Sequence, residues 1–266
     1  MSSYLAATAS RRVDGGSAAD VGTYAVDIDP GWAIGGNPHG GYLMALVAKA
    51  ALDAAESPHA LAVSAHFLRP PKGGPAEVRV EVVKRGRTAS TVRATLWQED
   101  KARLDTLITT GRLPEGPPSY AAVAMPDLMS PEECRARQET GATIELADHV
   151  DVRIDPRTSL TNGSGEPLIR GWMAFRDGTD IDAEALLLAV DIAPPTVAHL
   201  GHRGWAPTVE LSCLLRAEPR AGWLAFEARA TLVSDAWFDE ESTVWDSSGC
   251  VVAQSRQLAL VAAPGR

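Results

Sequence analysis

The sequence contains few cysteines and no cluster of basic residues. Its three cysteines, Cys134, Cys213 and Cys250, have neither C-x-x-C spacing nor another metal-binding spacing, and their odd number suits a reducing compartment. No run of Lys and Arg occurs, and the formal net charge is −9 at pH 7. Because phosphate binding needs concentrated positive charge, the sequence argues against nucleic acid as a partner.

Long apolar segments are also absent from the sequence. No hydrophobic run has the length of a membrane span, and the N-terminus lacks the apolar region of a signal peptide. We therefore expect no membrane partner and a cytoplasmic location. With 45% hydrophobic and 22% charged residues among 266, the chain has the composition of a soluble globular protein with one large domain or two small ones.

The sequence shows no marked nucleophile and no metal-binding pattern. A Ser-dependent hydrolase of the G-x-S-x-G type is disfavoured, because the motif is missing. Among the six histidines only His199 and His202 are closely spaced, and they flank Gly201 in what reads as a turn. We therefore expect neither a metal nor another cofactor.

One strongly marked helix is present, within residues 35–56. Asn37 is a good N-cap and Pro38 a good first helical residue, so the helix is expected to begin there. Apolar residues cover most of the circumference that follows and leave a polar stripe of Lys49, Asp53 and Glu56. Such a pattern predicts a helix that is buried on nearly every side.

Gly40 and Gly41 fall in the first turn of this helix. Glycine lowers helix propensity, but it lets another group approach the free N–H groups at the positive end of the helix dipole. The residues alone leave two readings open. The pair either allows close packing against a neighbouring element or faces a substrate.

Strand patterns surround the helix and then recur in the same order. In the first half they cover residues 23–28, 60–69, 76–84, 88–98 and 103–112. In the second half the sequence predicts a strand, a helix and four strands, over residues 168–175, 182–192, 208–216, 223–233, 241–245 and 250–261. The predicted domains are therefore 1–113, a connector rich in Pro, Gly, Ser and Glu over 114–165, and 166–266.

Individual residues support an internal duplication. Leu68-Arg69 and Leu215-Arg216 are offset by 147 positions, and Trp97 and Trp245 by 148. An antiparallel sheet curled round one helix is the economical packing for each half. We expect the two sheets to join edge to edge, which also buries exposed strand edges, with both helices on the same side.

This pattern resembles the acyl-CoA thioesterase II (TesB-like) family, within the double hotdog superfamily. The resemblance is carried by NPHGGYLMALVAKAA in the first half and by LLLAVDIAPPTVAHLG, APTVELSCLLR and VVAQSRQLAL in the second. It implies an α+β protein with a tandem (double) hotdog fold, in which two antiparallel sheets are each wrapped around a long central helix.

The resemblance also implies a site. The family places an Asp on the second helix, a Thr on the following strand and a Gln on the last strand, and the matching residues are Asp191, Thr208 and Gln257. The oxyanion and substrate-binding residues are expected at the start of the first helix, at Asn37, His39, Gly40 and Gly41.

The residues themselves support this site unequally. Asp191 closes an apolar run with no Lys or Arg within a helical turn, so its charge must be solvated or hydrogen-bonded. Thr208 is an ordinary strand residue, and only the family pattern selects it. Gln257 has Gln254 as a rival three positions earlier, and the family spacing favours Gln257.

The function implied is hydrolysis of an acyl-CoA thioester. The Asp, Thr and Gln would hold the water, and the helix N-terminus would bind the oxyanion. The acyl chain is expected in an apolar slot near the helices, and the protein is expected to form a homodimer or higher oligomer of double hotdogs. Candidates for the CoA phosphates are Arg69, Lys72, Arg85, Arg87, Arg203 and Arg216.

Two other functions are compatible with the fold. MaoC-like enoyl-CoA hydratases have an Asn-Pro pair in a similar loop, but their Asp is missing before Asn37, and His39 follows Pro38 directly. A non-catalytic acyl-CoA binding or sensing protein is the other alternative. Burial of Asp191 against the first helix start would favour hydrolysis, and exposure to solvent would favour binding.

Overall fold

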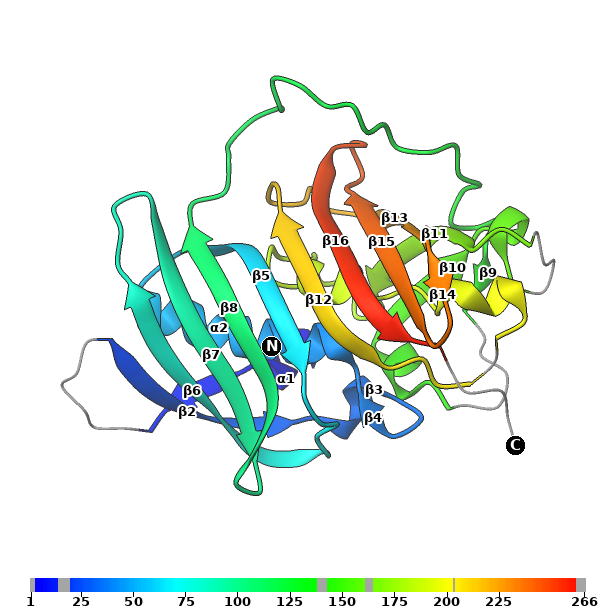
Figure 1. The fold of residues 1–266 in the computed structure, drawn as a ribbon. Coiled ribbons are helices and arrows are strands. Elements are labelled where there is room, and N and C mark those ends of the chain that lie inside the picture. The colour runs from blue at the N-terminus through cyan, green and yellow to red at the C-terminus, as the bar shows by residue number, and fades with distance from the viewer. Residues whose placement is uncertain (1–2, 14–19, 138–142, 161–164, 203, 262–266) are drawn as a thin grey trace.

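The structure, a computed structural model, describes residues 3–13, 20–137, 143–160, 165–202 and 204–261. Within them the chain forms one continuous, mainly antiparallel sheet of 14 strands (Figure 1). The strand order is β1-β2-β6-β7-β8-β5-β12-β16-β15-β13-β11-β10-β9, with β14 paired to β15. The two predicted sheets are therefore one sheet with two halves.

The N-terminal half of the sheet alternates buried and exposed residues, so one face packs on the core. Its strands are β1 Ser10–Arg12, β2 Val21–Ile28, β5 His59–Phe67, β6 Gly74–Lys84, β7 Ala89–Gln98 and β8 Lys101–Gly111. The C-terminal half has β9 Arg135–Ala136, β10 Val150–Ile154, β11 Leu168–Phe175, β12 Thr208–Leu215, β13 Leu224–Arg229, β14 Val233–Ser234, β15 Trp237–Trp245 and β16 Val251–Leu260.

The halves join through β5 and β12, which pair antiparallel from Ala62↔Leu214 to His66↔Glu210. The predicted edge-to-edge pairing is therefore present. Pairing at this seam satisfies the backbone groups of two strands that would otherwise be sheet edges.

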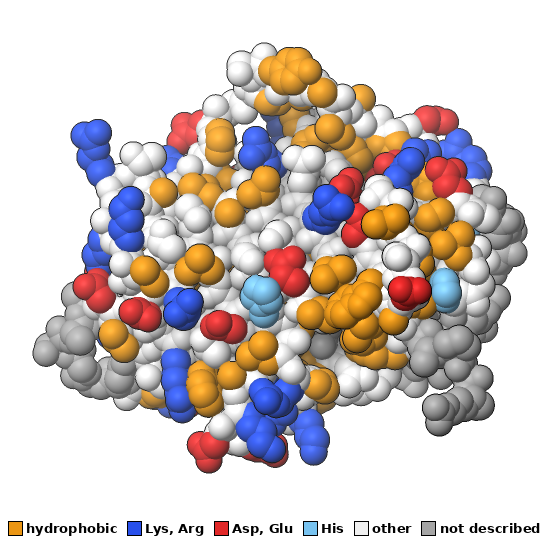
Figure 2. Space-filling model, in the orientation of Figure 1, with side chains coloured by type: hydrophobic (Ala, Val, Ile, Leu, Met, Phe, Trp, Pro, Cys, Tyr) orange, Lys and Arg blue, Asp and Glu red, His pale blue; other side chains and the backbone are white. Residues whose placement is uncertain are grey.

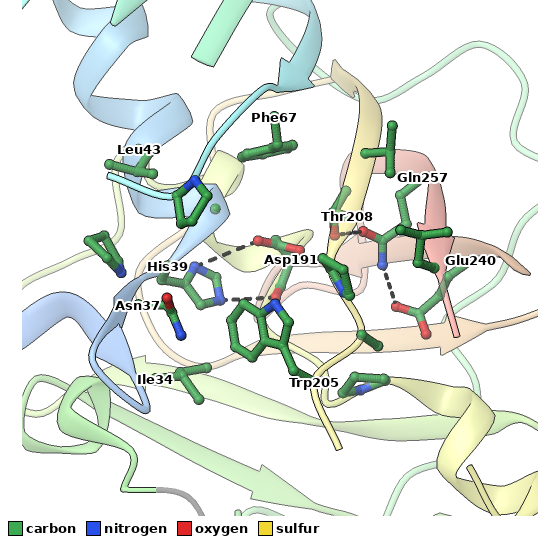
Figure 3. A pocket seen from close by; sticks show the side chains of 18 of the residues that line it. Ile34, Asn37, His39, Leu43, Phe67, Asp191, Trp205, Thr208, Glu240 and Gln257 are labelled. Atoms are coloured by element: carbon green, nitrogen blue, oxygen red, sulfur yellow. Dashed lines mark hydrogen bonds and ion pairs between the residues drawn. The ribbon is translucent and has the colours of Figure 1, made fainter. Parts of the chain in front are cut away.

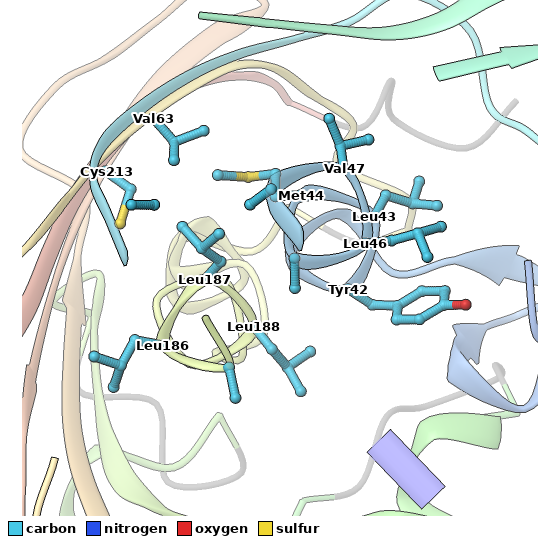
Figure 4. Packing of buried hydrophobic residues seen from close by; sticks show 14 of the residues in the cluster. Tyr42, Leu43, Met44, Leu46, Val47, Val63, Leu186, Leu187, Leu188 and Cys213 are labelled. Atoms are coloured by element: carbon cyan, nitrogen blue, oxygen red, sulfur yellow. The ribbon is translucent and has the colours of Figure 1, made fainter. Parts of the chain in front are cut away.

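Two helices lie on the same side of the sheet. Helix α2, Gly40–Ala55, contacts β6, β7 and β8 of the N-terminal half, and it also packs on the short helix α3, Leu186–Ala189. Figure 4 shows Met44 and Leu187 between the two helices, with Val63 and Cys213 on the sheet side. A further helix, α1 Ser3–Ala7, adds Tyr4 to the core.

The prediction of a long central helix in the second half is wrong. Only Leu186–Ala189 is α-helical, and the flanking turns use shorter i→i−3 bonds, such as Leu187 N–H to Glu184 O and Asp191 N–H to Leu188 O. Pro194 and Pro195 then supply no N–H for another turn. The second half thus presents a compact helical turn to α2 in place of a second long helix.

The first helix also begins later than predicted. Residues Asn37–Pro38 form the short strand β4, which pairs with β3, Ala33–Ile34, through a Gly35-Gly36 turn. Both glycines have positive φ, 58° and 75°, as a two-residue hairpin requires. Asn37 is therefore used in a hairpin, and His39 takes the N-cap position of α2.

Part of the predicted connector belongs to the sheet. Strand β10, Val150–Ile154, buries alternate residues and pairs with β11, while β9 pairs with β10. The alternation of Val150, Val152 and Ile154 is visible in the sequence, but the Pro- and Gly-rich surroundings hid it. The chain before β9 crosses over the top of the sheet in Figure 1.

Four short 3-10 helices complete the described elements: η1 Pro30–Trp32, η2 Glu145–Asp148, η3 Pro156–Thr158 and η4 Thr196–Leu200. The outer face of the sheet mixes charged, polar and hydrophobic side chains (Figure 2). Exposed hydrophobic residues of the sheet include Leu107 on β8, Leu214 on β12 and Leu258 on β16. In the described part of the chain, no helix combines the length and the apolar character that a membrane crossing needs.

Candidate active site

A cavity of about 410 Å³ opens where the two halves meet. The N-terminal half contributes β4, the start of α2 and the segment after β5. The C-terminal half contributes the segment after α3, the approach to β12, and strands β15 and β16. Of the residues predicted for the site, Asn37, His39, Gly40, Asp191, Thr208 and Gln257 all line this cavity.

The side chain of Asp191 extends from the C-terminal half of the molecule to the N-terminal half. Its Oδ2 accepts a hydrogen bond of 2.8 Å from the Gly41 N–H in the first turn of α2. The side chain is 15% exposed. Burial raises the pKa of Asp191 to about 6, although the Gly41 hydrogen bond and the charge of Arg137 both act to lower it. The carboxylate thus stands in for the cap that Asn37 was predicted to supply.

His39 approaches the same aspartate (Figure 3). Its Nε2 lies 3.1 Å from the backbone oxygen of Asp191, and its Nδ1 lies 3.7 Å from Oδ2. A carbonyl oxygen only accepts, so Nε2 carries the proton in this contact. The imidazole and the carboxyl group are therefore held close together at the helix start.

The absence of side chains at Gly40 and Gly41 lets residues of the C-terminal half lie close to the start of α2. A Cβ on Gly40 would lie 2.8 Å from Asp191 Oδ2, and a Cβ on Gly41 would lie 2.4 Å from the backbone oxygen of Leu187 in α3. Both open readings of the pair therefore have support. Gly41 permits close helix packing, and Gly40 gives access to the cavity.

Thr208 and Gln257 form a hydrogen-bonded chain with Glu240, which the sequence reading missed. Thr208 Oγ1 donates to Gln257 Oε1 at 2.6 Å, and Gln257 Nε2 donates to Glu240 Oε1 at 2.9 Å (Figure 3). Glu240 is 6% exposed, and its burial raises its pKa to about 7.

The sequence did hold a signal for Glu240. Strand β15 alternates, so Phe238, Glu240 and Ser242 share the buried face. The predicted strand began at residue 241 and excluded Glu240. A carboxylate on the apolar face of a strand is the unusual feature that marks it.

Among the basic residues predicted to meet CoA, Arg69 lines the cavity. Arg85 instead binds Asp20 and the carbonyl oxygens of Ala54 and Ala55, at the other end of α2. Arg203 lies outside the described residues. Arg103 and Arg137, which were not predicted, also line the cavity.

Comparison with known families adds to this geometry. Residues 28–111 match the acyl-CoA thioesterase N-terminal domain, and residues 131–261 match the acyl-CoA thioesterase C-terminal domain. The chain belongs to the acyl-CoA thioesterase family.

Relatives of this acyl-CoA thioesterase family member match most or all of its length. The crystal structure of "a putative thioesterase II" from Thermobifida fusca is 39% identical, with a TM-score of 0.89 over 100% of this chain and 98% of that one. An uncharacterized protein of Mycobacterium tuberculosis is 33% identical over 89% of this chain and 90% of its own. A hotdog protein of unknown function from Alicyclobacillus acidocaldarius, at 22% identity, shares the fold with a TM-score of 0.85 over 100% of both chains.

The two raised pKa values in this thioesterase-family site predict a pH dependence of stability. The folded-state pKa of Asp191 rises from 3.8 to about 6 and that of Glu240 from 4.5 to about 7, so between these values the folded state binds more protons than the unfolded state. The free energy of unfolding should therefore fall as pH rises from about 5 to about 8, by about 1 kcal/mol from Asp191 and about 2 kcal/mol from Glu240.

Urea unfolding at the two ends of this pH interval measures the loss. The double variant Asp191→Asn, Glu240→Gln should lose clearly less stability across the interval than the wild type. Glu184, whose pKa is also raised by burial, contributes equally to both proteins and cancels in the comparison. An equal loss in the two proteins would contradict the assignment of these raised pKa values.

Proposed function

We propose that the protein hydrolyses an acyl-CoA thioester, with Asp191 as the base that activates water. The observation that carries the proposal is the position of Asp191, which reaches from the C-terminal half to the start of α2 in the same cavity as Thr208 and Gln257. A carboxylate whose pKa is raised toward neutrality is suited to accept a proton.

In the proposed reaction, water lies between Asp191, Thr208 and Gln257. Its oxygen bonds to the thioester carbonyl carbon while Asp191 takes its proton, and the carbonyl electrons move to the oxygen. The tetrahedral intermediate then collapses, the C–S bond breaks, and the CoA sulfur leaves as a thiolate or takes the proton from Asp191. The products are a carboxylic acid and CoA.

The developing oxyanion needs fixed donors. The Gly41 N–H already donates to Asp191, so we assign this role to the Gly40 N–H and the positive end of the α2 dipole. Glycine at position 40 lets the thioester come close to the backbone, since its Cβ is missing. His39 and Asn37 border the same part of the cavity and are proposed to contact the thioester.

The two ends of the substrate meet different surfaces. Apolar side chains that line the cavity, Leu43, Phe67, Phe238 and Leu260, suit an acyl chain. Arg69 is the basic residue that we propose for a CoA phosphate, because it combines solvent exposure with a place on the cavity wall.

Hydration of an enoyl thioester is a second candidate function. It is supported by the 3.7 Å contact between His39 Nδ1 and Asp191 Oδ2, a His–Asp pair that the sequence did not predict. Hydrolysis is preferred because Thr208 and Gln257 also face the cavity, and because the family match is to thioesterases.

A series of acyl-CoA substrates of increasing chain length tests the proposal, with free thiol as the readout. We expect thiol release that rises and then falls with chain length, as a cavity of fixed size requires. A parallel assay with an enoyl-CoA follows the loss of its conjugated absorbance. Hydration without thiol release would favour the second function, and inactivity across both assays with retained acyl-CoA binding would favour a binding protein.

A further inference from the structure

Glu240 is a buried carboxyl group without a basic partner among the described residues. Its three hydrogen bonds all come from uncharged donors: the Thr196 N–H at 2.9 Å, Thr196 Oγ1 at 2.7 Å and Gln257 Nε2 at 2.9 Å. Burying a carboxylate without a cation is costly, so its presence next to the proposed water site requires an explanation.

The hydrogen bonds of Glu240 define the orientation of the Gln257 amide. Glu240 and Gln257 are directly paired neighbours on β15 and β16. In the ionised form, which predominates above the pKa of about 7, the Glu240 carboxylate only accepts, so the amide nitrogen of Gln257 must face it and the amide oxygen must face Thr208. The 2.6 Å bond from Thr208 Oγ1 to Gln257 Oε1 agrees with this orientation.

The orientation of the Gln257 amide in turn determines the direction of the Thr208 hydroxyl proton. Because the hydroxyl proton of Thr208 is used in the bond to Gln257, its oxygen lone pairs remain to face the cavity. An oxygen that presents lone pairs accepts a proton from water, as Asp191 does. A water with both protons accepted keeps a lone pair directed at the thioester carbon.

The geometry points to Glu240 as a positioning residue that sets the hydrogen-bond direction through Gln257 to Thr208 and so determines that Thr208 accepts from the attacking water. This inference rests on the proposed thioester hydrolysis. Glu240 does not touch the substrate; it acts through the two side chains that hold the water.

Glu240→Gln is predicted to reverse the direction of the hydrogen bonds that connect residue 240, Gln257 and Thr208. The backbone N–H of Thr196 is a fixed donor, so the new amide oxygen stays on Thr196 and the new amide nitrogen points at Gln257. Two amide nitrogens cannot donate to each other, and the Gln257 amide turns over. Its nitrogen then donates to Thr208, whose proton is released toward the cavity and binds the water lone pair needed for attack.

We expect kcat of Glu240→Gln to fall about tenfold or more, with KM nearly unchanged, because only the orientation of the water is altered. Glu241→Gln is the matched control, since Glu241 is exposed on the same strand, and it should keep wild-type kinetics. The melting temperature of Glu240→Gln should not fall, because the variant removes a buried charge. A purely structural role would lower both activity and melting temperature.

A charge-swapped double variant, Glu240→Gln with Gln257→Glu, restores the original direction. In this variant the amide at position 240 donates to the carboxylate at position 257, which again accepts from Thr208, so most of the lost kcat should return. The double variant Glu240→Gln, Thr208→Val should be no slower than Thr208→Val alone, because Glu240 acts through Thr208.

These results separate the inference from the proposed function. If the wild type releases no thiol from any acyl-CoA, the proposed function fails. If the wild type is active but Glu240→Gln keeps its kcat, or the swap recovers nothing while Glu240→Gln and Thr208→Val have additive effects, the inference alone is overturned.

Discussion

Replacing Asp191 by Asn is expected to lower kcat about a hundredfold or more while leaving the fold and acyl-CoA affinity nearly intact. The Asn oxygen can still accept the Gly41 N–H, so the cap of α2 survives. The Asn side chain cannot take a proton from water at neutral pH. The measurement is steady-state thiol release, combined with titration of a non-hydrolysable thioether analogue of acyl-CoA.

Asp100→Asn is the control for this experiment, because it removes a carboxylate from an exposed turn between β7 and β8. It should behave as wild type. Wild-type turnover in Asp191→Asn would refute the role of Asp191 as base. An acyl group trapped on another side chain would show a covalent route in its place.

Gly41→Ala is expected to destabilise the protein by about 3 kcal/mol, a large effect for one methyl group. In an unconstrained helix this change would stabilise by roughly 1 kcal/mol. Here the new Cβ would lie 2.4 Å from the Leu187 backbone oxygen and 2.8 Å from the Leu188 Cα. Since both are backbone positions of α3, the two helices must separate to relieve the contact. Chemical denaturation measures the loss.

Gly40→Ala is the matched comparison. The three heavy atoms nearest to its Cβ belong to side chains, Asp191 Oδ2 at 2.8 Å and two ring carbons of Phe67 at 3.1 Å, and side chains can move more easily than backbone. We expect it to lose less stability than Gly41→Ala but to lose thiol release, because the carboxylate is displaced from its position. If Gly41→Ala were as stable as wild type, the close helix contact would not hold in solution.

The general architecture could be read from the sequence, because alternation and repeated element order are local signals. The strands from β5 to β8 lie within a few residues of their predicted ranges. The helix of the second half was overestimated, since the apolar run from Leu186 to Val190 is equally compatible with a long helix and with a tight helical turn before two prolines. Only tertiary packing on α2 decides between these conformations.

The candidate site could be predicted only in part. Asp191 stood out as an unpartnered charge, but its bond to Gly41 spans 150 positions, and no local pattern specifies such a contact. Glu240 was overlooked because the start of its strand was placed too late. His39 was predicted from its position at the start of the first helix. Its proximity to Asp191 depends on how the two halves pack together, which no local pattern shows.

The pairing of β5 with β12 also determines how a substrate can enter. The two halves are held together in the sheet layer by the β5–β12 pairing, from Ala62↔Leu214 to His66↔Glu210. In the helix layer they are held together by the contact between α2 and α3. Opening the cleft by a hinge would break backbone hydrogen bonds in the middle of the sheet, which is costly. We therefore expect a molecule that enters the cavity to pass its border segments, residues 67–71 and 204–207, without separation of the two halves.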